Sequence, residues 1–168
     1  TCSRISIAKG IEDAVFAIDF INKRAGRIVA TLDIFGKPDS DYEKRFSELL
    51  SKAPVGVNYC GFIKNDETVE KLRDYYMLLF PSTYKGEGFP GTIWDAFAAG
   101  LPVIATNWRY NSEIVTHMET GFVYDYREKD GLLRSIEFSV FNRESVNEMK
   151  KSCLEWVSQF TPDRVFPI

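Results

Sequence analysis

The sequence has little of the chemistry that metal and redox sites need. Its 168 residues include one histidine, His117, and three widely spaced cysteines, with no C-x-x-C pair. Structural zinc sites take four Cys or His ligands at short spacings, so this composition argues against such a site. An odd number of scattered cysteines is typical of a reducing compartment, and we expect Cys60 and Cys153 to be buried thiols.

Long apolar runs and a strong charge of one sign are missing as well. No apolar stretch approaches the ~20 residues that a membrane-spanning helix needs, and none resembles a secretory signal. The formal net charge is only −3, so nucleic acid is not an expected partner. The length predicts a single domain, residues 1–168, and because the chain begins at Thr1 we treat it as a piece of a longer protein.

What the sequence does contain is an alternation of apolar runs and helical patterns. The runs predict strands at Arg27–Gly36, Gly56–Phe62, Tyr76–Ser82, Leu101–Asn107 and Thr120–Asp125. They are continuous, as expected for strands covered on both faces. Helical periodicity covers residues 11–21, 42–50, 66–75, 91–99, 132–140 and 145–160, and Asn111-Ser112-Glu113 predicts one more helix start. This order indicates βαβ units and an α/β fold with a parallel sheet.

Open parallel sheets bind ligands at the carboxyl ends of their strands. The loops of interest therefore follow Gly36, Phe62, Ser82 and Asn107, together with the loop after a strand that would precede Arg4.

One of these loops carries three glycines in the spacing of a dinucleotide fingerprint, Gly86, Gly88 and Gly91. The carboxylate of Glu87 would repel a pyrophosphate, and the loop stands halfway along the chain instead of after a first strand. A carboxylate beside a helix start is better suited to accept hydrogen bonds from the neutral hydroxyls of a sugar. Phosphates would then need cations, which Arg4 and Lys9 can supply, although taken alone these two residues look like surface cations.

A series of short motifs in fixed order carries a family resemblance. These motifs are Ser3-Arg4, Lys9-Gly10, Pro81-Ser82, Glu87-Gly88-Phe89, Asp95-Ala96, Ala98, Gly100–Thr106, Glu113-Ile114-Val115 and Thr120–Val123. Together they cover nearly the whole chain. The sequence resembles the C-terminal, nucleotide-sugar-binding domain of a GT-B glycosyltransferase of family 4, the glycosyl transferases group 1. The resemblance implies a Rossmann-like, three-layer α/β/α fold that forms the C-terminal half of such an enzyme.

The resemblance also implies a role for each matching residue. Arg4 and Lys9 would hold the diphosphate of the donor and stabilise the leaving nucleoside diphosphate, and Glu87 would accept hydrogen bonds from the donor sugar. The other implied contacts to the donor come from Phe89, Pro90, Gly91 and Thr92 near the sugar and phosphates, Asp95 at the ribose, and Gly36, Phe62 and Ile63 around ribose and base. No cofactor and no metal ion are expected.

Some residues depart from the family pattern or have a second interpretation. Asp95 replaces a glutamate, and Thr92-x-x-Asp95 resembles a capping box, so Asp95 either contacts ribose or caps its helix. Pro90 replaces a glycine and removes one backbone donor.

The paired glycines expected before Glu113 are absent, which favours a structural role for Glu113. Trp94, Phe97 and Trp156 are interpreted as core, His117 as a surface or satisfied histidine, and Tyr84 and Lys85 as either solvated loop or donor site.

The implied activity is retaining transfer of a hexosyl group from a UDP- or GDP-linked sugar to a glycan or a lipid-linked acceptor. The resemblance implies that such an enzyme works in bacterial polysaccharide or glycolipid biosynthesis, in the cytoplasm or at the inner face of the membrane. The acceptor would bind an N-terminal domain absent from this chain, so the fragment alone should be nearly inactive. The alternatives are a non-catalytic nucleotide-binding or scaffolding module, a related GT-B nucleotide-sugar epimerase and, more remotely, a dehydrogenase.

Overall fold

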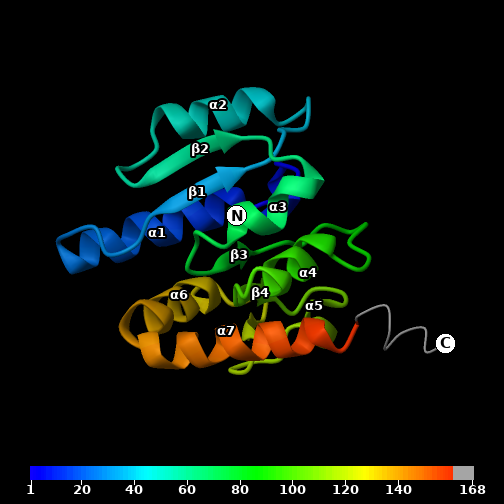
Figure 1. Cartoon of the computed structure of the whole chain (residues 1–168). Coiled ribbons are helices and arrows are strands. Elements are labelled where there is room, and N and C mark those ends of the chain that lie inside the picture. Colours follow the sequence, from blue (N-terminus) through cyan, green and yellow to red (C-terminus); the bar gives the residue numbers. More distant parts are fainter. Residues whose placement is uncertain (161–168) are drawn as a thin grey trace.

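Parallel β-strands form the middle layer of the molecule (Figure 1). The computed structural model describes residues 1–160, so the last eight residues of the expected domain lie outside the described part. The strands are β1 (Leu32–Phe35), β2 (Val57–Gly61), β3 (Leu78–Phe80), β4 (Val103–Thr106) and β5 (Gly121–Tyr124). Each lies inside one of the predicted runs and is shorter than the run. Strand β1 pairs with β2, while β3, β4 and β5 form a second group, and every pair is parallel.

Helices connect the strands as the sequence predicts. They are α1 (Ile11–Ala25), α2 (Glu43–Ser51), α3 (Asn65–Leu72), α4 (Gly91–Ala98), α5 (Asn111–Ile114), α6 (Gly131–Phe141) and α7 (Arg143–Ser158). A short 3-10 helix, η1 (Ile7–Lys9), was not predicted. Within residues 1–160, no helix has the length and the apolar composition that crossing a bilayer requires.

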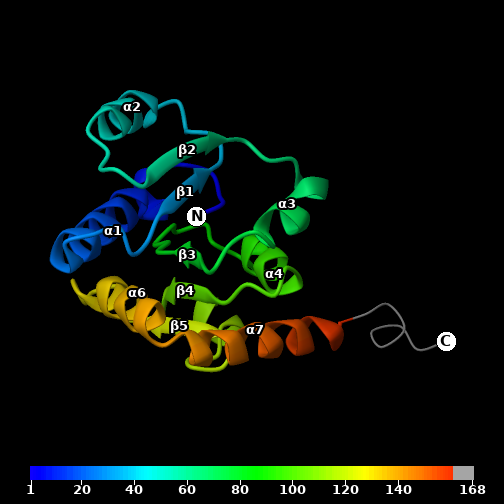
Figure 2. The same ribbon diagram turned by 60° about the vertical axis from the view of Figure 1, so that its left-hand side comes forward.

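Alternate side chains of the strands enter two separate cores, which makes the fold three layers deep. Leu79 and Ile104 pack in the core that contains α1 and α6. Their neighbours Leu78 and Val103 point the other way, into the core formed with α4 and α7. Figure 2 shows α1 and α6 on one side of the strands and α4 on the other. The predicted α/β/α architecture is confirmed.

Strand β2 departs from the expectation that all strands are covered on both faces. It lies at the outer edge of its two-stranded group, and its three middle residues, Asn58, Tyr59 and Cys60, are exposed. The prediction of a buried Cys60 is therefore wrong, because β2 has a neighbouring strand on one side only and its side chains are less covered than those of a central strand. Cys153 is fully buried in the core beside α4, as predicted.

Two glycines allow the close chain crossings on which the site depends. Gly36 follows β1 with φ 140°, and a Cβ there would lie 1.7 Å from the carbonyl oxygen of Ser3. Gly10 has φ 67°, and a Cβ there would lie 2.4 Å from the carbonyl oxygen of Pro81. Only glycine combines these positive φ values with such close approach. The crossings bring the N-terminal segment against the loops that follow β1 and β3.

Candidate functional site

The loop after β3 and the η1–α1 junction meet at the carboxyl edge of the sheet. The backbone N–H of Thr83 donates to the carbonyl of Ala8 at 2.7 Å, which joins the two segments. This contact places Lys9, the last residue of η1, next to the loop that carries Glu87. The meeting point is at the sheet edge where parallel α/β folds bind ligands.

Lys9 and Glu87 form a buried ion pair in this junction. The Lys9 Nζ and Glu87 Oε2 atoms are 2.7 Å apart, and the two side chains are only 9% and 10% exposed. The Ser82 hydroxyl donates to the same Oε2 at 2.5 Å. Both bonds use Oε2, and within residues 1–160 the other oxygen, Oε1, has no hydrogen-bond partner. Oε1 is therefore the atom of Glu87 that can accept a hydrogen bond from a ligand.

This pair changes two interpretations made from the sequence. Lys9 is not a surface cation, because its side chain is only 9% exposed. The expected repulsion between Glu87 and a phosphate is also weaker than the sequence suggested, because Lys9 compensates the negative charge at close range. Lys9 and Glu87, which come from separate motifs, are in direct contact.

A buried polar chain behind the pair holds the β3 loop in place. The Thr106 hydroxyl donates to the carbonyl of Ser82 at 2.5 Å and accepts from Asn111 Nδ2 at 3.3 Å. All three residues are buried, and Asn111 Oδ1 is an interior atom without a partner among the described residues. Sequence reasoning did not assign Thr106 or Asn111 a role, because a threonine at a strand end and an asparagine at a helix start carry no specific signal.

Tyr84 contacts both of the cations that are expected to bind phosphate. The Arg4 guanidinium carbon lies 4.9 Å from the centre of the Tyr84 ring, and Lys9 Nζ lies 5.3 Å from it. Trp108 Nε1 donates to the Tyr84 carbonyl at 2.8 Å and fixes the backbone there. The ring therefore brings the two expected phosphate ligands together. Arg4 is about half-exposed and also reaches Asp39, with Nε 3.4 Å from Oδ1.

Helix α4 begins directly after the glycine loop, with Pro90 at its N-cap. The first helical residues, Gly91 and Thr92, have backbone N–H groups that the helix itself cannot satisfy, and these groups carry the positive end of the helix dipole. Phe89, just before the helix, is 62% exposed. This part of the chain can thus offer backbone donors and one apolar ring to a ligand, although Pro90 contributes no donor.

Asp95 does not cap its helix. The helix begins at Gly91, so Thr92 is its second residue, not its N-cap, and no side chain bonds the cap position. The capping-box interpretation is therefore wrong, because the helix starts two residues earlier than that motif requires. The Asp95 carboxyl is half-buried, and burial raises its pKa above the usual range. Contact between Asp95 and ribose remains a prediction.

The remaining candidates lie on the loops that follow β1 and β2. The Gly36 carbonyl accepts from the Tyr59 hydroxyl at 2.9 Å, and the close approach of Ser3 already explains why this position is glycine. Phe62 is 68% exposed and Ile63 is half-buried. In the described part of the chain, no hydrogen bond links Gly36, Phe62 or Ile63 to the Lys9–Glu87 pair, and their roles remain predictions.

The structural interpretations of the aromatic residues and of the histidine agree with the structure. Trp156 packs edge-on against Phe97 and Trp94, with ring centres 5.2 Å and 5.5 Å apart. His117 is exposed, and its Nδ1 accepts the backbone N–H of Val123 at 3.1 Å. Glu113 lies in the first turn of α5. Among residues 1–160, no three His, Cys, Asp or Glu side chains gather as metal ligands would.

Comparison with curated proteins shows relatives along nearly the whole chain. A 2-deoxystreptamine N-acetyl-D-glucosaminyltransferase of Niallia circulans is 32% identical over 167 residues, which are 97% of this chain and 39% of that protein. A GDP-mannose-dependent alpha-(1-6)-phosphatidylinositol monomannoside mannosyltransferase of Mycobacterium tuberculosis is 28% identical over 165 residues, 93% of this chain and 41% of that protein. The chain thus spans about two-fifths of the length of these relatives.

Solved structures share the fold. The chain superposes on HepE of Anabaena in complex with UDP with a TM-score of 0.81 at 20% identity, over 94% of this chain and 43% of that one. It also superposes on the C-terminal domain of a group 1 glycosyl transferase from Francisella tularensis, with a TM-score of 0.78 at 19% identity, over 94% of this chain and 82% of that one. The protein family described as "Glycosyl transferases group 1" matches residues 1–156. The chain therefore belongs to the group 1 glycosyl transferase family, and its fold is that of the C-terminal domain of a GT-B glycosyltransferase.

Proposed function

We propose that this domain binds the nucleotide-diphosphate sugar donor of a retaining hexosyltransferase. The observation that carries the proposal is the buried Lys9–Glu87 pair beside the half-exposed Arg4, all three at the carboxyl edge of the sheet. Two cations and one acid in contact can bind the charged and the uncharged parts of one ligand at the same time. The names of the two curated relatives, which specify an N-acetylglucosaminyl and a GDP-mannose-dependent transferase, support a hexosyl donor.

In this proposal the diphosphate lies against Arg4 and Lys9. Arg4 can turn from the partly exposed carboxylate of Asp39 to a phosphate, because ion pairs near the surface contribute little stability. The free backbone N–H groups of Gly91 and Thr92 add donors. As the bond between sugar and phosphate breaks, negative charge grows on the leaving diphosphate, and fixed cations stabilise that charge more than they stabilise the ground state.

Glu87 and Asp95 take the uncharged parts of the donor. Glu87 Oε1 would accept a hydrogen bond from a sugar hydroxyl, while Lys9 and Ser82 hold Oε2 and fix the orientation of the carboxylate. Asp95 would accept from the ribose hydroxyls. We propose UDP or GDP as the nucleotide and a glycan or a lipid-linked acceptor, in cytoplasmic bacterial polysaccharide or glycolipid synthesis. The acceptor would bind in a part of the protein outside this chain.

The test is a binding panel of UDP, GDP, ADP and their sugars, measured by calorimetry or thermal shift. Arg4→Ala should weaken nucleoside diphosphate binding roughly 10- to 150-fold, the equivalent of a charge-assisted hydrogen bond of about 1.5–3 kcal/mol. Glu87→Gln should leave diphosphate binding within about threefold and remove the extra affinity that the sugar adds.

Arg45→Ala is the matched control, because Arg45 is also an exposed arginine paired with a carboxylate, that of Glu12, but it comes from α2. It should leave nucleotide binding unchanged. Equal effects of Arg4→Ala and Arg45→Ala would mean that only the net charge matters. Equal losses of diphosphate and of sugar diphosphate in Glu87→Gln would contradict the role given to Glu87.

A further inference from the structure

Two aromatic rings and an arginine form a surface at the carboxyl ends of β4 and β5. Trp108 lies on the loop after β4 and Tyr126 on the loop after β5, and their ring centres are 5.0 Å apart at an angle of 82°. The Arg109 guanidinium carbon lies 5.7 Å from the centre of the Trp108 ring. Arg109 and Tyr126 are exposed, and Trp108 is half-buried. We call these three residues the aromatic platform.

Hydrogen bonds tie the platform to its surroundings. Asn107 N–H donates to the carbonyl of Tyr124 at 2.7 Å, and Tyr126 N–H donates to Asn107 Oδ1 at 3.2 Å, so the two loops are joined. Trp108 Nε1 donates to the Tyr84 carbonyl, which joins the platform to the loop after β3. Neither Trp108 nor Tyr126 packs in the two cores. The rings are therefore held in place beside the candidate site without serving the core.

Arg109 has a backbone conformation that favours glycine. Asn111 N–H donates to the Trp108 carbonyl at 3.2 Å, which closes a turn with Arg109 and Tyr110 at its centre. Arg109 has φ 54°, whereas Tyr110 has φ −92° and ψ 3°. A turn with positive φ at only its first central residue is of type II′, in which glycine is the usual residue there. The family pattern has its paired glycines at these two positions, so this chain carries an arginine at a cost in backbone strain. Strain of this kind points to a use for the side chain.

The Arg109 charge is available to a ligand. Within residues 1–160 Arg109 forms no ion pair, whereas Arg127, on the next loop, binds the Asp125 carboxylate through Nε at 3.0 Å and Nη2 at 2.7 Å. A guanidinium offers N–H donors in one plane, and the hydroxyls of a sugar can accept from them. The C–H groups on the face of a sugar ring are apolar and can pack on aromatic rings. The platform therefore offers both kinds of contact that a sugar ring needs.

The donor, as proposed above, does not extend to the platform. Its ribose and base are expected at the loops after β1 and β2, and its sugar at Glu87 on the loop after β3. Both ribbon views show β4 and β5 on the side of β3 away from β1 and β2 (Figures 1 and 2). The platform thus lies beyond the donor sugar, on the side away from the nucleotide. A molecule bound there would be next to the sugar that is transferred.

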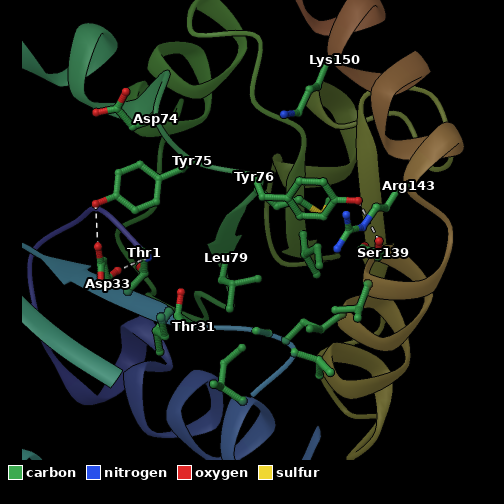
Figure 3. Close-up of a pocket in the computed structure, with 18 of the residues that line it drawn as sticks. Thr1, Thr31, Asp33, Asp74, Tyr75, Tyr76, Leu79, Ser139, Arg143 and Lys150 are labelled. Carbon is green, nitrogen blue, oxygen red and sulfur yellow. Dashed lines mark hydrogen bonds between the residues drawn. The ribbon is translucent and has the colours of Figure 1, made fainter. Parts of the chain in front are cut away.

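A cavity in another part of the molecule does not have this position. Its volume is about 790 Å³, and it lies between β1 and β3 (Figure 3). Thr31 and Met77, at the amino ends of these two strands, are among its lining residues. It therefore opens at the opposite edge of the sheet from Glu87, and a molecule in it could not reach the donor sugar.

We propose that the aromatic platform is a subsite for a sugar ring of the acceptor. The proposal rests on the donor-binding function proposed above, and it adds one contact surface of this domain to an acceptor site that otherwise lies outside the chain. The ring would pack on Trp108 and Tyr126, and its hydroxyls would accept hydrogen bonds from Arg109. The acceptor would then be a molecule that presents a sugar ring, either a glycan or the headgroup of a glycolipid.

The experiment is a titration of the isotope-labelled chain with the methyl glycosides of glucose, mannose and N-acetylglucosamine, followed by nuclear magnetic resonance. At least one glycoside should shift the Trp108 indole signal and the amide signals of the β4 and β5 loops saturably, with a Kd of ~1–10 mM. The shifts should persist when the chain is saturated with a UDP- or GDP-sugar. Their loss would overturn the proposal, because the platform would then hold the donor's own sugar.

Arg109→Gly separates a binding role from a structural one. Glycine relieves the strained turn, so the melting temperature should stay the same or rise, while glycoside binding should weaken at least about fivefold. Tyr126→Ala removes a ring from the other loop and should weaken glycoside binding as well. Phe16→Ala is the control, because Phe16 belongs to another exposed aromatic pair, with its ring centre 6.1 Å from that of Phe20 on α1. It should leave glycoside binding unchanged.

Two outcomes distinguish this subsite from the donor site. If no UDP- or GDP-sugar binds the chain, the proposed donor function is contradicted. If nucleotide sugars bind but no glycoside shifts the platform signals, only the subsite is overturned. Unchanged glycoside binding in both Arg109→Gly and Tyr126→Ala would overturn the subsite too, because neither side chain would then contact the sugar.

Discussion

The most direct energetic consequence of the structure concerns Lys9→Met. This substitution keeps most of the side-chain volume and removes the ammonium group, which leaves the Glu87 carboxylate 90% buried with only the Ser82 hydroxyl as partner. Removing one member of a buried ion pair costs about 3–5 kcal/mol, because the remaining charge is uncompensated. Since about 1 kcal/mol shifts the melting temperature of a domain of this size by roughly 2–4 °C, the midpoint should fall by about 6–20 °C.

The assays are thermal unfolding for the midpoint and urea unfolding for the free energy, both followed by circular dichroism, with the slope of the urea transition compared between variants. Lys151→Met is the matched control. The Lys151–Glu148 pair has the same 2.7 Å separation of nitrogen and oxygen, but its side chains are 67% and 71% exposed. Breaking it should cost at most about 0.5 kcal/mol, because exposed pairs contribute little. The contrast between the two variants isolates the effect of burial at constant geometry.

The double variant Lys9→Met, Glu87→Gln completes the test. It buries no unpaired carboxylate, so it should recover most of the stability lost in Lys9→Met. If Lys9→Met costs under about 1 kcal/mol, like the exposed control, or if the second substitution restores nothing, Lys9 and Glu87 are not a buried, coupled pair and the geometry assigned to the site is wrong.

Three further predictions follow from particular residues. Gly36→Ala should lower the free energy of unfolding in urea by at least about 2–3 kcal/mol, because its Cβ would collide with the Ser3 carbonyl at a positive φ. Gly88→Ala is the control: it has open space around it and should cost under about 1 kcal/mol. Burial raises the pKa of Cys153 to about 12, so the stability linked to its protonation is fully present below the thiol's ordinary pKa of about 8.5 and is lost as the pH rises toward 12. Between pH 9 and 11 the free energy of unfolding of the wild type should therefore fall by up to ~1.4 kcal/mol per pH unit more than that of Cys153→Ala. Identical pH dependences of the two proteins would contradict this prediction. Tyr84→Leu should weaken UDP binding about twofold to fivefold by calorimetry, since Arg4 and Lys9 lose a cation–π contact worth ~0.5–1 kcal/mol, and unchanged affinity would remove Tyr84 from the site.

The strands and helices could be predicted from the sequence because their signals are local. Apolar runs predicted each of the five strands found in residues 1–160, and helical periodicity predicted most of the helices between them. Exposure was harder to predict, because it depends on the order of strands in the sheet. Cys60 lies in an apolar run like the others, yet β2 is an edge strand and its middle is open to solvent.

The contacts among the candidate site residues could not be predicted from the sequence. Lys9 and Glu87 belong to separate motifs 78 residues apart, and nothing in either motif indicates that their side chains touch. The role of Tyr84 between the two cations depends on a loop shape that Trp108 fixes from 24 residues away. For Asp95, a shift of two residues in the start of α4 decided against capping, and sequence patterns place helix ends only to within a few residues.

The central claim is that Arg4 and Lys9 hold the diphosphate of the donor while Glu87 holds its sugar. A crystal structure of the protein with an intact nucleotide-diphosphate sugar tests it most directly. We expect diphosphate oxygens within hydrogen-bond distance of the Arg4 guanidinium and the Lys9 ammonium, and a sugar hydroxyl donating to Glu87 Oε1. A diphosphate bound away from both cations, with Glu87 facing only solvent, would contradict the account.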